Sequence, residues 1–204
     1  MAFVDVPTFL EQIRAFYKEN APFLLEQSLS PASPEALASF ETKCGHVLPE
    51  GYKSFLQHSD IAHPFIFNYD CLSLSRVENS WQIMSDLLDE GAFNDGRVAH
   101  HVKEGFGNWD GRYIKQVWWS KGWIPFAEDG CGNMYCIDCT PGPNGTMHQI
   151  MQMEIQDGQG PFISQYTSFE HYLTHHLTLL NEGKYEVEHE PEYNWGTVMI
   201  DPYM

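Results

Sequence analysis

The chain has 204 residues, 43% of them hydrophobic, which is the composition of a folded domain and excludes an intrinsically disordered chain. Acidic side chains outnumber basic ones by 28 to 11, giving a formal net charge of −17. A surface with this much negative charge repels phosphate backbones and anionic lipid headgroups. We therefore expect no binding to nucleic acid or to membranes. The same charge favours a basic partner by long-range attraction.

Two features of the sequence indicate the cytoplasm. Residues 1–10 lack the basic and apolar regions of a secretory signal, and no run of about 20 apolar residues predicts a membrane span. The five cysteines are an odd number without the paired spacing of a disulfide framework. We therefore expect a cytoplasmic protein with reduced thiols.

Three helices are predicted in the first part of the chain. Residues 7–20 have apolar side chains at helical spacing, and residues 21–34, with three prolines, are expected to form a connector. Ser33 has the N-cap position of a second helix, which Gly45 ends. A third, short helix begins at residues 48–52.

The middle of the chain gives weaker signals. Residues 64–68 and 72–74 are predicted as two short strands, and residues 74–90 as a helix with an apolar stripe. Residues 91–115 are rich in Gly, Asn and His and are expected to be mostly loop.

The pattern changes to alternation after residue 117. Strands are predicted near residues 124–127 and 133–138, and Asp129-Gly130 between them is a strong hairpin signal. Further strands are expected at residues 148–155 and 161–166.

A last helix closes the predicted fold. Ser168 has its N-cap position, Leu180 lies at its end and Gly183 stops it. The tail at 185–204, acidic and then aromatic, is expected to add a strand or to cover the sheet. We predict one α+β domain over residues 1–204: an antiparallel meander with N-terminal helices and a C-terminal helix packed against it.

The segment WSKGWIPFAEDGCGN at residues 119–133 resembles the signature of the SUKH superfamily, which includes the fungal Smi/Knr cell-wall regulator. Residues 48–56, 141–145 and 169–173 are similar to other family segments in the same order, so the resemblance covers about residues 30–182. The positions that match the motif are Trp123, Pro125, Asp129, Gly130, Gly132, Asn133 and Asp138.

The residue chemistry gives this motif a structural role. Glycines 130 and 132 allow positive φ angles in a tight turn, and Asp129 can accept hydrogen bonds from backbone amides two residues on. Trp123 supplies core area. The motif is thus interpreted as a folding device, not an active site.

Other residues have spacings known from metal sites. Cys131, Cys136 and Cys139 have a ferredoxin-like spacing, but no fourth cysteine follows them. His171 and His175 lie four apart on a predicted helix, without a third ligand in view. Histidines 100, 101 and 176 are expected at the surface, and we expect no metal and no cofactor. A pair among Glu128, Asp129 and Asp138 for acid–base work stays open as an alternative.

The resemblance implies a non-enzymatic protein-binding module, for which two uses are known in the family. We favour an immunity protein that neutralises a basic, nuclease-type toxin; the alternative is a regulator linked to cell-wall synthesis. A second alternative is a metal-dependent hydrolase. The sequence leaves the oligomeric state open. The residues expected to contact a partner are Trp109, Tyr113, Glu186, Glu188, Glu190, Glu192, Tyr193 and Trp195.

Overall fold

The computed structural model describes residues 3–26, 30–61, 69–94, 113–154, 160–193 and 195–200. Its helical elements are α1 (Val6–Asn20), η1 (Pro22–Glu26), α2 (Pro34–Cys44), α3 (Glu50–His58), α4 (Leu74–Asp89), η2 (Ala92–Asn94), α6 (Phe169–Asn181) and η3 (Pro191–Tyr193). Its strands are β1 (Asp70–Cys71), β2 (Trp123–Glu128), β3 (Met134–Asp138), β4 (Gln149–Glu154), β5 (Gly160–Ile163), β6 (Glu186–Glu190) and β7 (Trp195–Met199).

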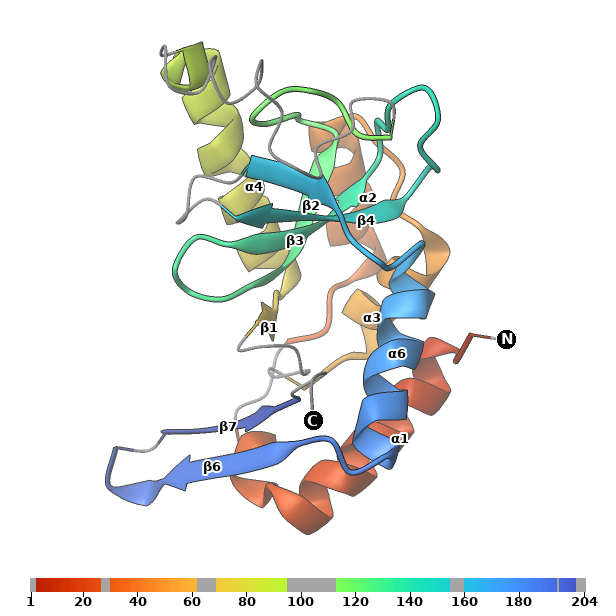
Figure 1. The fold of residues 1–204 in the computed structure, drawn as a ribbon, viewed down its shortest axis with the longest axis vertical. Coiled ribbons are helices and arrows are strands. Elements are labelled where there is room, and N and C mark those ends of the chain that lie inside the picture. The colour runs from red at the N-terminus through yellow and green to blue at the C-terminus, as the bar shows by residue number, and fades with distance from the viewer. Residues whose placement is uncertain are drawn as a thin grey trace.

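Five strands form the main sheet in the order β1-β2-β3-β4-β5, and every neighbouring pair is antiparallel. Strands β2 to β5 thus form a meander in chain order (Figure 1). Strands β6 and β7 form a separate two-stranded sheet, which lies beside α1 and below the main sheet in Figure 1. The α+β fold with an antiparallel meander is therefore confirmed.

Local sequence signals fix the ends of the helices. The Oδ1 atom of Asp5 accepts a hydrogen bond from the Thr8 amide at 2.9 Å and caps α1. Ser33 caps α2 through the Ala36 amide, and Gly45, with φ 75°, ends it in the left-handed region. Ser168 caps α6 in the same way as Ser33 caps α2. The predictions for Ser33, Gly45 and Ser168 are confirmed.

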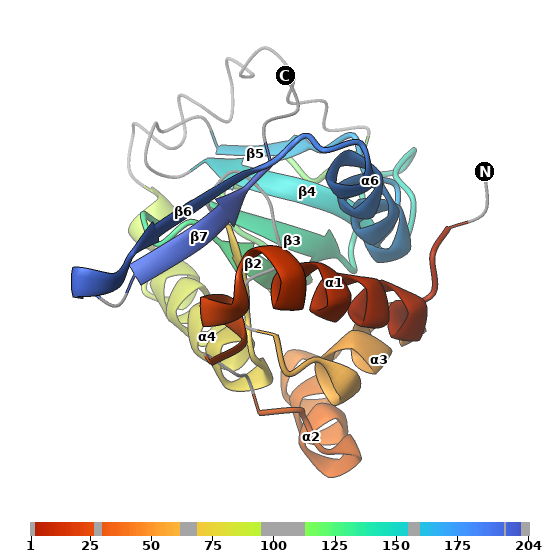
Figure 2. The same ribbon diagram turned by 90° about the horizontal axis from the view of Figure 1, so that it is seen from below.

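The core lies between the sheet and the helices around it, whose arrangement Figure 2 shows from below. The Phe126 ring of β2 contacts Tyr52 of α3 and both Phe169 and Tyr172 of α6. Helix α4 reaches the segment before β2, where the Trp81 indole donates to the Lys121 carbonyl at 2.8 Å. Strands β2 and β3 are consequently buried along almost their whole length.

The strand predicted at residues 72–74 is wrong. The strand is β1 at residues 70–71, and the Ser73 side chain caps α4, so that Leu74 is already helical. Leu72 still donates its amide to the Phe126 carbonyl at 2.9 Å, which extends the contact with β2. The strand predicted at residues 64–68 lies outside the described residues.

In the part of the chain that the structure describes, no helix is both long and apolar enough to cross a bilayer.

Candidate protein-binding surfaces

The turn between β2 and β3 is built around Asp129. Its Oδ1 atom accepts hydrogen bonds from the Cys131 and Asn133 amides at 2.8 and 3.0 Å, and its Oδ2 atom accepts from Asn133 Nδ2 at 2.7 Å. Gly130 and Gly132 have φ angles of 75° and 104°, a region that disfavours side chains. The motif residues therefore close a hairpin, as predicted, and Asp129 is fully engaged in holding it.

Asp138, at the end of β3, is the second charged residue of the motif and is fully buried. Its carboxylate accepts hydrogen bonds from the Thr140 amide at 2.9 Å and from Gln149 Nε2 at 3.1 Å. Burial raises the pKa of the Asp138 carboxyl, and these hydrogen bonds oppose that rise. The Gln149 side chain also donates to the Tyr113 carbonyl at 2.8 Å, so the network fastens the segment before β2 to the sheet.

The remaining motif residues are structural as well. Trp123 is fully buried and lies opposite Asp138 in the β2–β3 register, while Pro125 lies opposite Cys136. The register shifts between Pro125 and Ala127, which marks an irregularity in β2 at the proline. Both side chains, Trp123 and Pro125, are buried.

The three cysteines with ferredoxin-like spacing have different surroundings. Cys131 is exposed at the hairpin turn, whereas Cys136 and Cys139 are buried. Burial raises the pKa of the Cys139 thiol to about 12 and also raises that of Cys136. Within the described ranges no group of three His, Cys, Asp or Glu side chains could hold a metal ion.

The histidines of α6 have separate surroundings. His171 Nδ1 lies 3.2 Å from both the amide nitrogen and the hydroxyl of Thr167, and its ring stacks on Phe3. The surface position predicted for His176 is wrong: it is 3% exposed and packs on Tyr172 with ring centroids 4.7 Å apart. His176 follows Tyr172 by one helical turn, so it lies on the inner face of α6. Histidines 100 and 101 lie outside the described residues.

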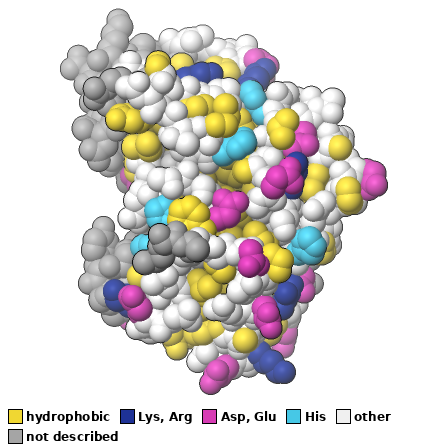
Figure 3. All heavy atoms as spheres, turned by 90° about the vertical axis from the view of Figure 1, so that its right-hand side faces the viewer, with side chains coloured by type: hydrophobic (Ala, Val, Ile, Leu, Met, Phe, Trp, Pro, Cys, Tyr) yellow, Lys and Arg dark blue, Asp and Glu magenta, His cyan; other side chains and the backbone are white. Residues whose placement is uncertain are grey.

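The acidic residues predicted to bind a partner lie on an exposed strand. All five residues of β6 are exposed, and Glu186, Glu188 and Glu190 share one face because side chains alternate along a strand. Glu192 follows in η3 and is also exposed. Other acidic side chains are scattered over the face drawn in Figure 3, so the negative charge is not confined to this strand. We call Glu186, Glu188 and Glu190 the acidic face of β6.

The opposite face of this hairpin attaches to the domain. The His189 ring stacks on Phe23 of η1 with centroids 3.9 Å apart and an interplanar angle of 3°. Gly196 lies opposite His189 in the register, and a Cβ atom there would collide with the Phe23 ring. Val198 is buried, and Tyr185 packs edge-on against Phe16 of α1. The acidic face of β6 therefore points away from the surface on which the hairpin rests.

The aromatic residues predicted to contact a partner lie in different parts of the chain. Trp109 lies outside the described residues. Tyr113 is 40% exposed, and its carbonyl also accepts the Gly142 amide at 2.8 Å. Tyr193 ends η3 and Trp195 begins β7. Tyr113 accordingly has an exposed side chain on a backbone that Gln149 and Gly142 hold, and it belongs to no strand.

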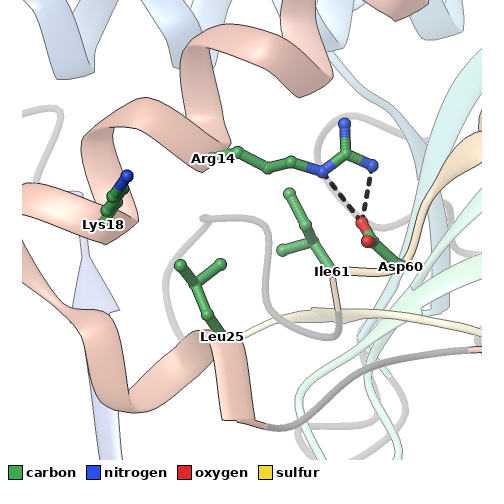
Figure 4. Close-up of a pocket in the computed structure, with 5 residues that line it drawn as sticks. All are labelled: Arg14, Lys18, Leu25, Asp60 and Ile61. Atoms are coloured by element: carbon green, nitrogen blue, oxygen red, sulfur yellow. Dashed lines mark hydrogen bonds and ion pairs between the residues drawn. The ribbon is translucent and has the colours of Figure 1, made fainter.

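The sequence reasoning missed a pocket between α1, η1 and the segment after α3. It is lined by Arg14, Lys18, Leu25, Asp60 and Ile61 (Figure 4). The spacing of Arg14 and Lys18, one helical turn apart, was visible in the sequence. Nothing in the sequence showed that Leu25 and Ile61 would meet them.

Comparison with known proteins assigns this α+β fold and its hairpin to a family. The model of the SMI1 / KNR4 family (SUKH-1) matches residues 31–175, which is more than half of the chain, and the chain belongs to this family. The resemblance found in the hairpin motif is thereby confirmed.

Two curated relatives are fungal proteins. A KNR4/SMI1 homolog of Yarrowia lipolytica is 26% identical over 125 residues, which are 60% of this chain and 14% of the relative. KNR4/SMI1 homolog 2 of Debaryomyces hansenii is 47% identical over 38 residues, 19% of this chain and 6% of the relative. The chain thus matches only a small part of the length of either relative.

Proposed function

We propose that this protein is a non-catalytic protein-binding module that recruits a basic partner through the acidic face of β6. The observation that carries the proposal is that Glu186, Glu188 and Glu190 are all exposed and form no ion pair with a described residue. Family membership supports a binding module in place of an enzyme. We place its work in the cytoplasm, in keeping with its free thiols.

The acidic face acts mainly on the rate of encounter. Exposed charges attract a partner over a Debye length of about 8 Å at physiological salt, and they raise association rates more than they strengthen the final complex. The affinity of the complex would come from aromatic anchors, since a few such residues usually carry most of the binding energy. Tyr113 is the exposed candidate whose side chain the structure describes.

The particular use that we propose is immunity against a basic, nuclease-type toxin. A nuclease binds its substrate through a basic cleft, and a partner with a net charge of −17 complements such a cleft. The family resemblance supports this use, because neutralising a toxin is one of the two uses that the resemblance implies.

A second candidate is a regulator that acts on cell-wall synthesis through protein contacts. The names of the two fungal relatives, both KNR4/SMI1 homologs, favour it. The metal-dependent hydrolase has less support. Asp138 is fully buried in a hydrogen-bond network, Asp129 holds a turn, and Glu128 lies 3.6 Å from an Arg76 nitrogen, so each of the three carboxylates has a structural partner.

The test begins with capture of the partner from the cells that produce the protein, followed by stopped-flow association of the two purified proteins. Replacing Glu186, Glu188, Glu190 and Glu192 by Lys should slow association about tenfold or more at low salt, because steering is reversed. The difference should shrink as salt rises. Inhibition of the partner's nuclease activity on plasmid DNA separates the immunity role from a regulatory one.

A matched control reverses four exposed glutamates elsewhere: Glu11, Glu19, Glu35 and Glu90. This variant has the same net charge as the hairpin variant but an intact acidic face, so it should associate faster. Equal slowing in both variants would assign the effect to the charge of the whole molecule. An on-rate that neither salt nor charge reversal changes would refute recruitment by charge.

A further inference from the structure

A pocket of about 340 Å³ opens between α1, η1 and the segment that follows α3 (Figure 4). This volume is at the lower end of the range for small-molecule sites. Figure 4 shows side chains from all three stretches around it: Arg14 and Lys18 from α1, Leu25 from η1, and Asp60 with Ile61 from the third. The pocket shares no described lining residue with the acidic face of β6.

Arg14 is hydrogen-bonded to two residues at one side of the pocket. Its Nε and one terminal nitrogen donate to Asp60 Oδ1 at 3.0 and 2.6 Å, and the same terminal nitrogen donates to the His58 carbonyl at 3.1 Å. A guanidinium fixed by three hydrogen bonds leaves its aliphatic stem as a wall of the pocket. Its charge is largely balanced by the Asp60 carboxylate.

Lys18 supplies a charge that is not balanced in this way. It is exposed, lies one turn after Arg14 in the last turn of α1, and forms no ion pair with a described residue. Among the described lining residues, Arg14, Lys18 and Asp60 sum to a charge of +1, on a molecule whose formal net charge is −17.

The other side of the pocket is apolar. Ile61 is 3% exposed and forms its floor, and Leu25 is 38% exposed at its edge. Both residues lie within reach of one small group, because they line the same depression as the two basic side chains (Figure 4). An occupant therefore meets a cation on one side and aliphatic carbon on the other.

We propose that this pocket binds a carboxylate carried on a short aliphatic body, with the carboxylate at Lys18 and the body on Leu25 and Ile61. A monoanion matches the charge of +1. A phosphate dianion would not match, since it would face Asp60 and the acidic field of the whole molecule. Two sources share this chemistry: the C-terminal carboxylate of a peptide and a free organic acid.

Titration followed by amide NMR shifts tests the proposal with four probes. N-acetyl-L-leucine and N-acetyl-L-leucinamide differ only in the charged group, and the peptide acetyl-Gly-Gly-Ala-Leu is used with a free or an amidated C-terminus. The acid should bind with a Kd on the order of 1 mM, as expected for so small a ligand, and shift amides at Lys18, Leu25 and Ile61. Each amide probe should bind at least about fivefold more weakly than its acid.

Two variants and one control locate the site. Lys18→Met should weaken the acid about fivefold or more, and Leu25→Ser should weaken acid and amide alike. Lys43→Met is the matched control, since Lys43 is also an exposed lysine in the last turn of a helix, and it should leave binding unchanged.

The titrations distinguish the two sources of the carboxylate. Tighter binding of the peptide acid than of N-acetyl-L-leucine assigns the site to chain termini, and equal binding assigns it to small acids. Acid and amide of equal affinity, or equal losses in Lys18→Met and Lys43→Met, would overturn the carboxylate site.

Discussion

The hairpins β2–β3 and β6–β7 have the same antiparallel pairing, but their strands β3 and β6 have opposite surroundings. Every side chain of β3 is buried, and in β2 only Glu128 is partly exposed, whereas all of β6 is exposed. The charged residues follow this division: Asp129 and Asp138 are committed to hydrogen bonds inside the fold, while Glu186, Glu188 and Glu190 are not.

Acidic residues therefore have two different surroundings in this chain, with different effects on stability. A carboxylate that accepts several backbone amides contributes to stability, because each hydrogen bond to a charged group is worth about 1.5–3 kcal/mol. A solvated carboxylate contributes little to stability. The first hairpin therefore stabilises the fold, and the acidic face of the second is the surface that we propose for a partner.

Asp129→Ala breaks the first hairpin at its turn and should have the largest effect. It removes three hydrogen bonds, and because the turn is partly exposed we expect a loss of about 2 kcal/mol in the free energy of unfolding. Thermal unfolding should show a Tm lower by about 4–8 °C. Asp129→Asn, which keeps an acceptor for the amides, is the milder control; an equal loss in both would contradict the role of the amide bonds.

Gly196→Ala should loosen the second hairpin and leave the first intact. The added methyl group collides with the Phe23 ring and displaces it from His189, at a cost of about 1–2 kcal/mol. Hydrogen exchange should speed up in β6 and β7 but not in β2 and β3. In a Phe23→Ala background the same substitution should cost almost nothing, and a full additive cost there would refute the contact.

Buried His176 of α6 should make the stability of the fold depend on pH. Burial lowers its pKa well below the usual value, with a smaller contribution from His175. The unfolded chain therefore binds a proton below about pH 6.5 that the folded chain does not, and stability falls as pH falls. Between pH 6.5 and 5.5 the wild type should lose about 1 kcal/mol that His176→Phe retains. Chemical unfolding at the two pH values measures this, and identical losses would contradict it.

Reversal of Glu186, Glu188, Glu190 and Glu192 should have the smallest effect on stability. These side chains are solvated, so the free energy of unfolding should change by less than about 0.5 kcal/mol at physiological salt. Denaturant unfolding of the lysine variant checks this. A loss of stability comparable to that of Asp129→Ala would show that the acidic face stabilises the fold.

Sequence patterns predicted the elements whose signals are local. The β2–β3 hairpin followed from the alternation around Asp129-Gly130, and the helix ends from Ser33, Gly45 and Ser168. The strand β1 was displaced in the prediction because two residues carry no periodicity, although Ser73 had the composition of a helix cap.

Features that depend on distant contacts could not be predicted. The pairing of β6 with β7 has little apolar signal, because Val187 is the one hydrophobic residue of β6, and its support comes from Phe23. The pocket beside Arg14 requires Ile61, which lies 47 positions later in the sequence. His176 could have been placed correctly from its spacing to Tyr172 and Leu180, which are both apolar and both one turn away.

The pairing order of the main sheet has a consequence for the time course of folding. Strands β2 to β5 pair with their neighbours in the sequence, so their loops close quickly. Helix α1 packs on α6, and the Val4 amide donates to Thr174 Oγ1 at 2.8 Å across 170 positions. We expect this contact to form late, since closing so long a loop costs the most entropy. During synthesis, the part of α1 that packs on α6 therefore stays uncovered until α6 has left the ribosome, and a chaperone could bind it in that period.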